Sequence, residues 1–184
     1  MISLPFDELN ILKQQLVDVQ SMPDSEEKDK AVKRVIDEVE EMLAMDYFYG
    51  VLDASEGIGR SISPDTDEAK AVIYEQFDGK DFKDRLNEYL YSGTAYDIAR
   101  VIDTDAHRVY NAAIYTAGKR EGAKTKTWNC MMLPTSRDTH IYLDKVTVGI
   151  DDEFYNYKGN STYYPGQWGI AEEDCNCLCW ITIS

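Results

Sequence analysis

The residues best suited to chemistry lie near the C-terminal end of the chain. All four cysteines occur between residues 130 and 179, together with His140, one of two histidines. Thiolates and imidazoles are typical zinc ligands, so His140, Cys177 and Cys179 are suitable by type. The candidates for a fourth ligand are Cys175, Cys130 and a carboxylate such as Asp144. A structural zinc site is therefore one interpretation of this cluster.

The spacing of the cysteines leaves other interpretations open. Cys175, Cys177 and Cys179 alternate, and alternate residues of an extended strand point to one face about 7 Å apart. That separation suits at most two of them around one ion. Free thiols packed as small hydrophobic side chains beside a hydrogen-bonded histidine explain the same residues. The sequence therefore does not decide between zinc, a disulfide and free thiols.

A cysteine nucleophile with His140 as its base is the enzymatic interpretation of the cluster. Such a site needs an activated thiolate, an oxyanion site and a group that orients the imidazole. The sequence identifies none of these, so we expect the chain not to be an enzyme. We expect Arg137 to have a structural role instead, pairing with Asp144 or Glu173 to close this part of the chain.

Composition limits the class of protein. The chain has 184 residues, of which 43% are hydrophobic and 29% charged, as in ordinary globular proteins. Its formal net charge of -15 disfavours binding to phosphate backbones, so we expect no nucleic-acid partner. No apolar run approaches the roughly 20 residues that span a bilayer, and the start of the chain lacks signal-peptide features. We therefore expect no membrane association and folding in a cytosol, where structural disulfides are rare.

The first two thirds of the chain follow helical periodicity. Pro5 suits the first turn of a helix, and Ser25 suits the cap of a second one. Three glycines between residues 50 and 63 predict a loop after the second helix. The expected helices cover about 5–20, 24–43, 63–79, 81–91, 96–102 and 103–122.

The character of the sequence changes after residue 122. Short β-branched or aromatic runs separated by Pro, Gly, Asn and Asp predict strands at 125–132, 140–143, 146–150 and 180–183. A long polar and aromatic segment, 154–166, lies between them. We therefore predict an α+β protein with a helical region, 1–122, followed by a small loop-rich β-containing module, 123–184.

The order of several short motifs is typical of one protein family. The motifs are a helix at 104–113, Lys126-Thr127-Trp128, Arg137-x-x-His140, Leu143-Asp144, Phe154, Glu172-Glu173 and Asn176-Cys177-x-Cys179. In this order they resemble the phage head morphogenesis family of MuF-type minor head proteins. The resemblance is strongest from about residue 82 to residue 183. Leu178 stands where the family usually has Arg, and Lys145 where it usually has Gly.

The resemblance implies a structural component of the virion. Family members are low-copy minor capsid proteins that associate with the portal protein or other capsid proteins during head assembly. It therefore implies a noncatalytic protein located in the capsid, and in the bacterial host cytoplasm during assembly, encoded by a phage or prophage. In some relatives a toxin or enzyme follows this module; if the chain is complete at Ser184, we expect none here.

Two further hypotheses belong to other classes of protein. One is a small cysteine- and histidine-dependent enzyme or toxin-related domain. The other is a metal-stabilised protein-interaction module. Under the favoured hypothesis, Trp128, Arg137 and Asp144 are structural residues around the His140 and cysteine cluster.

Overall fold

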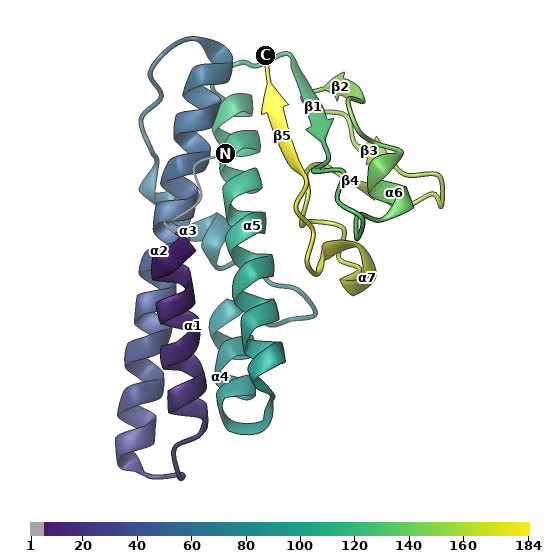
Figure 1. Cartoon of the computed structure of the whole chain (residues 1–184). Helices are drawn as coiled ribbons and strands as arrows, with labels where there is room; N and C mark the ends of the chain where they lie inside the picture. Colours follow the sequence, from purple (N-terminus) through teal and green to yellow (C-terminus); the bar gives the residue numbers. More distant parts are fainter. Residues whose placement is uncertain (1–5) are drawn as a thin grey trace.

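The long helix α5 (Ala95–Arg120) lies between the other helices and a small β module (Figure 1). This computed structural model describes residues 6–184. The remaining helices on the N-terminal side are α1 (Phe6–Gln20), α2 (Glu26–Ile58), α3 (Thr66–Ile73) and α4 (Phe82–Ser92). The first helix starts at Phe6 in the described part, so the expected start at Pro5 lies outside the described residues.

Short strands and single-turn helices make up the C-terminal module. Its elements are β1 (Thr125–Asn129), α6 (Asp138–Ile141), β2 (Thr147–Gly149), β3 (Phe154–Tyr155), β4 (Ser161–Thr162), α7 (Ala171–Asp174) and β5 (Trp180–Ile183). An antiparallel sheet has the order β2-β1-β5, and β3 pairs with β4. The α+β class is therefore confirmed.

Side-chain caps fix where several helices begin. The Ser25 side chain accepts a hydrogen bond from the backbone N–H of Lys28 at the start of α2, and Asp81 caps α4 in the same way. Thr94 and Asp97 form a reciprocal capping box at the start of α5. These caps confirm the predicted starts of α2 and α4.

The predicted loop at 50–63 is wrong over its first half. Helix α2 continues through Gly50 to Ile58 and ends at Gly59, which takes the left-handed conformation. A Cβ atom at Gly50 would lie 2.4 Å from the backbone oxygen of Tyr110, and one at Gly57 would lie 2.7 Å from that of Ile183. These glycines therefore permit close packing of α2 against α5 and β5, and they do not break the helix.

Three other helix boundaries differ from the prediction. Helix α3 begins at Thr66 and not at residue 63, because the Asp65 side chain caps it by accepting from the backbone N–H of Glu68. It ends at Ile73 and not near residue 79, where the buried Arg108 guanidinium binds the backbone oxygens of Val72 at 2.7 Å and Ile73 at 3.4 Å. The segments 96–102 and 103–122 form one helix, α5, since no glycine or proline interrupts it before its final turn.

The predicted strand at 140–143 is also wrong, because His140 lies in the short helix α6. A run of four residues is too short for periodicity to separate a helix from a strand. Strand β1 ends at Asn129 and not at residue 132, and β2 covers the middle of the predicted 146–150 segment. The prediction of 180–183 is confirmed by β5.

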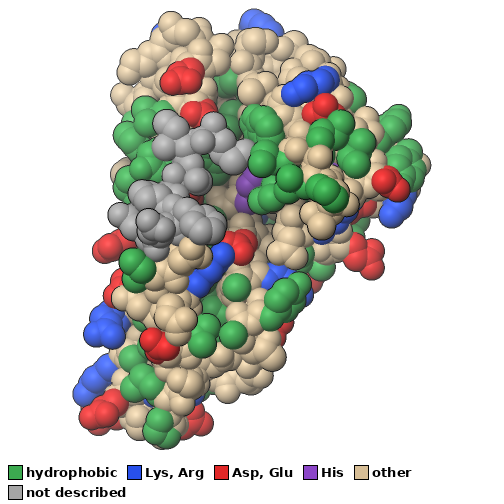
Figure 2. All heavy atoms as spheres, viewed as in Figure 1, with side chains coloured by type: hydrophobic (Ala, Val, Ile, Leu, Met, Phe, Trp, Pro, Cys, Tyr) green, Lys and Arg blue, Asp and Glu red, His purple; other side chains and the backbone are tan. Residues whose placement is uncertain are grey.

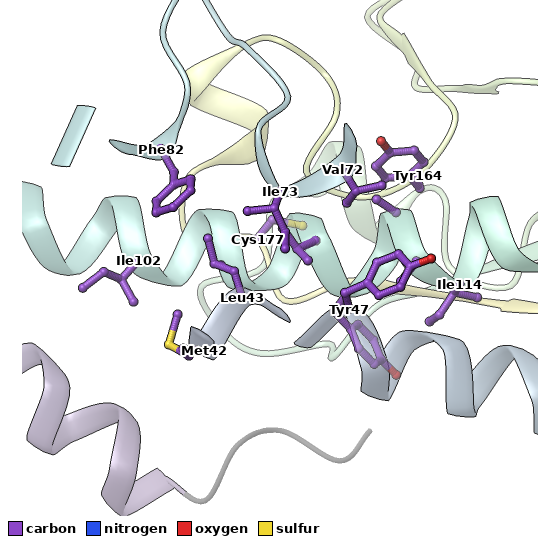
Figure 3. Packing of buried hydrophobic residues seen from close by; sticks show 14 of the residues in the cluster. Met42, Leu43, Tyr47, Val72, Ile73, Phe82, Ile102, Ile114, Tyr164 and Cys177 are labelled. Carbon is purple, nitrogen blue, oxygen red and sulfur yellow. The ribbon is translucent and has the colours of Figure 1, made fainter. Parts of the chain in front are cut away.

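One cluster of buried hydrophobic residues extends through the helices and the module. Figure 3 shows Leu43 and Tyr47 of α2 in the same cluster as Ile102 of α5 and the module residues Tyr164 and Cys177. The predicted boundary between 122 and 123 falls in the turn after α5, and the core crosses it. Among residues 6–184, no helix has both the length and the apolar character needed to cross a membrane.

Replacing Gly50 by alanine tests the close contact between α2 and α5. Alanine favours a helix by about 1 kcal/mol over glycine. Its Cβ, however, would lie 2.4 Å from Tyr110 O and 2.6 Å from Ala113 Cβ. We expect Gly50→Ala to lower the free energy of unfolding by roughly 1–3 kcal/mol in urea denaturation. Glu41→Ala, at an exposed position of the same helix, is the control. A Gly50→Ala variant more stable than the native chain would contradict the close contact between α2 and α5.

Candidate functional site

The imidazole of His140 faces two thiols in the interior of the module. Its Nδ1 atom lies 3.4 Å from Cys177 Sγ and 3.5 Å from Cys179 Sγ. All three residues are buried, and their potential ligand atoms lie within 4.8 Å of one another. The structure therefore brings together three of the four residues that the sequence suggested as metal ligands.

A turn after α7 brings the two thiols to the same imidazole. Asn176 has φ of +56°, in the left-handed region, and the backbone N–H of Cys177 donates to Asp174 O. Residues 175–179 are therefore not the extended strand that the sequence argument assumed. The half-buried Cys175 lies outside the group of three, so two of the three alternating cysteines share one centre.

The other side of the imidazole faces a buried carboxylate. His140 Nε2 lies 3.1 Å from Glu173 Oε2, without the alignment of a direct hydrogen bond. Glu173 also accepts hydrogen bonds from Thr139 Oγ1 at 2.8 Å and Asn156 Nδ2 at 3.2 Å, which hold it in place. A carboxylate at this position favours the tautomer with its proton on Nε2, which leaves the Nδ1 lone pair toward the thiols.

Aromatic rings enclose the histidine. The ring of Trp168 stacks on His140 with centroids 5.9 Å apart, and Trp128 meets it edge-on at 5.6 Å. Trp128 is fully buried and also contacts Phe154 and Trp168. This packing restricts the orientation of the imidazole and keeps bulk water away from it.

The two thiols differ in their electrostatics. The neighbouring Cys179 thiol holds the pKa of Cys177 well below its usual value despite burial, and the nearby His107 and His140 lower it further. The neighbouring Cys177 and burial together raise the pKa of Cys179. The pair therefore favours one thiolate, on Cys177, with Cys179 as its hydrogen-bond donor.

The space beside the thiols is small. A hollow of about 30 Å³ is lined by His140, Cys177, Cys179 and the side chains of Arg137 and Leu178, among others. This volume has room for about one water molecule. The cluster is therefore better suited to a bound ion or a structural contact than to attack on a substrate.

Arg137 and Asp144 are placed differently from the expectation. Arg137 donates a hydrogen bond to the backbone oxygen of Cys175 and forms no ion pair with Asp144 or Glu173. Asp144 accepts from the backbone N–H of Cys130 at 2.8 Å and lies 3.8 Å from Lys145 Nζ. Arg137 is the residue before α6, and Cys175 lies in the turn after α7. The hydrogen bond from Arg137 to Cys175 O therefore joins the start of α6 to this turn.

Sequence reasoning missed Asn111, which joins the module to α5. This fully buried side chain accepts from the backbone N–H of Ile181 at 3.0 Å and donates to Cys179 O at 3.3 Å. The signal was a lone polar residue within the apolar stretch 109–114 of a helix. A buried amide in such a stretch must have partners, and here they belong to the module.

His107 and Asp46 lie at the same junction. His107 is half-buried and its Nε2–H donates to the backbone oxygen of Cys179. Asp46 of α2 is buried, and one of its oxygens has no hydrogen-bond partner. Burial raises the pKa of Asp46 to about 7, although the charge of His107 acts in the opposite direction. On the face drawn in Figure 2, hydrophobic side chains gather on the module at the right.

A larger cleft of about 430 Å³ lies apart from the cluster, between α4, α5 and the segment before α7. Its charged groups largely neutralise one another. Asp105 binds Arg85 at 2.6 Å and Arg108 at 3.1 Å, and Arg108 also binds Glu75 at 3.0 Å. The cleft therefore offers little unpaired charge to a ligand.

The chain matches no known family profile and no solved structure. It is similar to minor head protein GP7 of Bacillus phage SPP1, with 29% identity over 79 residues, which cover 41% of this chain and 26% of that protein. It is also similar to NAD(+)–arginine ADP-ribosyltransferase EFV of Enterococcus faecalis, with 30% identity over 110 residues, which cover 49% and 22%. The chain thus spans about a quarter of each of these curated relatives.

Replacing Asp46 by asparagine tests the buried carboxyl at the junction. Because the folded protein raises its pKa from 3.8 to about 7, ionisation of Asp46 lowers stability as the pH rises between these values, and the full cost is present above pH 7. Near pH 4, we expect the Asp46→Asn variant and the native chain to have the same free energy of unfolding. At pH 8 the variant should be roughly 2–4 kcal/mol more stable.

Urea denaturation at the two pH values measures this difference. The exposed Asp37→Asn on the same helix is the matched control, and its effect should not change between them. A pH-independent effect of Asp46→Asn would contradict the raised pKa.

Proposed function

We propose that the chain is a noncatalytic structural protein of a phage head, of the MuF-type minor head class, that binds the portal protein or another capsid protein during head morphogenesis. The similarity to minor head protein GP7 of Bacillus phage SPP1 is the observation that carries this proposal. The ordered motifs from Trp128 to Cys179 support it independently. Such a protein acts in the host cytoplasm during assembly and resides in the virion afterwards.

The cluster supports a structural role. His140, Cys177 and Cys179 are each less than 5% exposed, and the hollow beside them has room for about one water molecule. A nucleophilic enzyme needs its thiolate within reach of a substrate carbon. The buried thiols are better suited to hold α6, α7 and β5 together.

An apolar stripe on α2 provides a docking surface for the head partner. Met45, Phe48 and Leu52 follow helical spacing, and their exposed fractions are 42%, 39% and 37%. Three exposed apolar residues on one helix face are typical of a surface that a partner covers. Since the chain has a net charge of -15, the complementary partner surface is apolar with basic flanks.

The similarity to an ADP-ribosyltransferase agrees with this proposal if the shared part is not the catalytic part. The chain covers 22% of that protein, so most of the transferase lies outside the matched region. We infer that the two relatives share a head-protein module and that transferase activity belongs to the remainder of EFV. This chain should then transfer no ADP-ribose from NAD⁺ to an arginine substrate, and measurable transfer would favour the enzymatic alternative.

Co-expression with the portal protein of the same phage tests the function. We expect the two proteins to co-purify, and we expect this chain in mature particles. Phe48→Glu places a charge in the apolar stripe, so it should reduce co-purification at least tenfold. Tyr96→Glu, at a residue 64% exposed on α5, is the matched control and should bind normally.

Two results would contradict the proposal. One is that neither the portal protein nor any other head protein co-purifies with the native chain while the chain is also absent from mature particles. The other, for the docking surface alone, is normal binding by a folded Phe48→Glu variant.

A further inference from the structure

We propose that His140, Cys177 and Cys179, with Cys130 as the fourth ligand, bind one zinc ion that closes the C-terminal module. The proposal concerns the chemistry of this chain alone. It holds or fails independently of the phage function.

The distances in the cluster match those around a tetrahedral zinc ion. Zinc binds thiolate sulfur at about 2.3 Å and imidazole nitrogen at about 2.0–2.1 Å, which places a sulfur and a nitrogen ligand about 3.6 Å apart. The Nδ1 atom of His140 lies 3.4 Å from Cys177 Sγ and 3.5 Å from Cys179 Sγ. Three ligand atoms are therefore already spaced around a common centre.

Strand register places the proposed fourth ligand, Cys130, one residue beyond the end of β1 and next to the site. Strands β1 and β5 are antiparallel, with Asn129 opposite Trp180, so the next pair in the same register is Cys130 and Cys179. Directly opposed residues have Cβ atoms about 4.5–5.5 Å apart and point to the same face. Cys130 is buried, but its thiol lies outside the group of three whose ligand atoms are within 4.8 Å of one another, so its side chain must turn toward the ion to bind it. A set of three cysteines and one histidine is typical of structural zinc sites.

The surroundings of His140 are those of a metal ligand. Histidines that bind metals through one ring nitrogen usually present the other to a carboxylate or a backbone oxygen, which fixes the tautomer and strengthens the ligand. Glu173 Oε2 lies 3.1 Å from Nε2, on the opposite side of the ring from the thiols. Thr139 and Asn156 hold this carboxylate in place.

The two other candidate ligands lie elsewhere. Cys175 is half-buried outside the group, and its backbone oxygen binds Arg137. Asp144 accepts from the backbone N–H of Cys130, which orients the residue that we assign as the fourth ligand. Cys175 is therefore a matched control for the cysteines of the site.

An ion at this centre also stabilises the junction with the helices. The backbone oxygen of Cys179 binds His107 and Asn111 of α5. Fixing the Cys179 side chain to His140 therefore fixes the start of β5 against α5. The small module has little core of its own, and metal binding is a common means of stabilising such modules.

Elemental analysis of the full chain purified without chelator tests the proposal. We expect about one zinc per chain in the native protein and in Cys175→Ser. Cys177→Ser and His140→Ala should each lose at least tenfold in zinc affinity. Cobalt replacement should give thiolate-to-cobalt charge-transfer absorption from three thiolates, reduced by one thiolate in Cys130→Ser.

A second measurement uses only the native chain, so it tests the zinc site even if the variants do not fold. The native chain is stripped with a chelator and zinc is titrated back while tryptophan fluorescence is followed, because Trp128 and Trp168 contact His140. We expect saturation at one equivalent with recovery of the native spectrum.

Two results would overturn the zinc site. One is native protein without zinc in which all four thiols react as free cysteines, together with no response to added zinc. The other is a disulfide between two of these cysteines detected by mass spectrometry. An unchanged cobalt spectrum in Cys130→Ser would remove Cys130 from the ligand set.

Discussion

The open edge of strand β5 is paired by a side chain of helix α5 instead of another strand. Asn111 binds the N–H of Ile181 and the backbone oxygen of Cys179 with one buried amide. Each of these groups would cost about 1–3 kcal/mol if it were buried without a partner. The contact therefore sets where β5 starts, and with it the position of Cys177 and Cys179 relative to His140. The geometry of the His140, Cys177 and Cys179 cluster therefore depends on helix α5, although α5 contains none of these three residues.

The fold class and several element boundaries could be predicted because they depend on local chemistry. Ser25 and Asp81 cap their helices with their own side chains, and β5 buries Ile181 and Ile183 at alternate positions. The continuation of α2 could not be predicted, because Gly50 is explained by its contact with Tyr110, which lies far away in the sequence. Sequence patterns record a glycine as a helix breaker, and only the packing shows that it permits a close approach.

The same distinction applies to the site. Residue type identified His140, Cys177 and Cys179, but their convergence results from the left-handed turn at Asn176, which periodicity does not reveal. The role of Glu173 was hidden by the large number of acidic residues in the chain. The resulting arrangement is a buried centre beneath aromatic rings, with exposed apolar residues elsewhere on the surface. This separation agrees with the proposed role, in which one region gives internal stability and another binds a partner.

Unfolding followed by two probes tests the coupling between the helices and the module most directly. All three tryptophans lie in the module, at 128, 168 and 180, so their fluorescence reports its unfolding. Far-UV circular dichroism reports mainly the helices α1 to α5. The shared core and the Asn111 contact predict that the two urea denaturation curves of the native chain coincide. A fluorescence transition at lower urea than the helical one would contradict this account, because the module would then unfold while the helices remain.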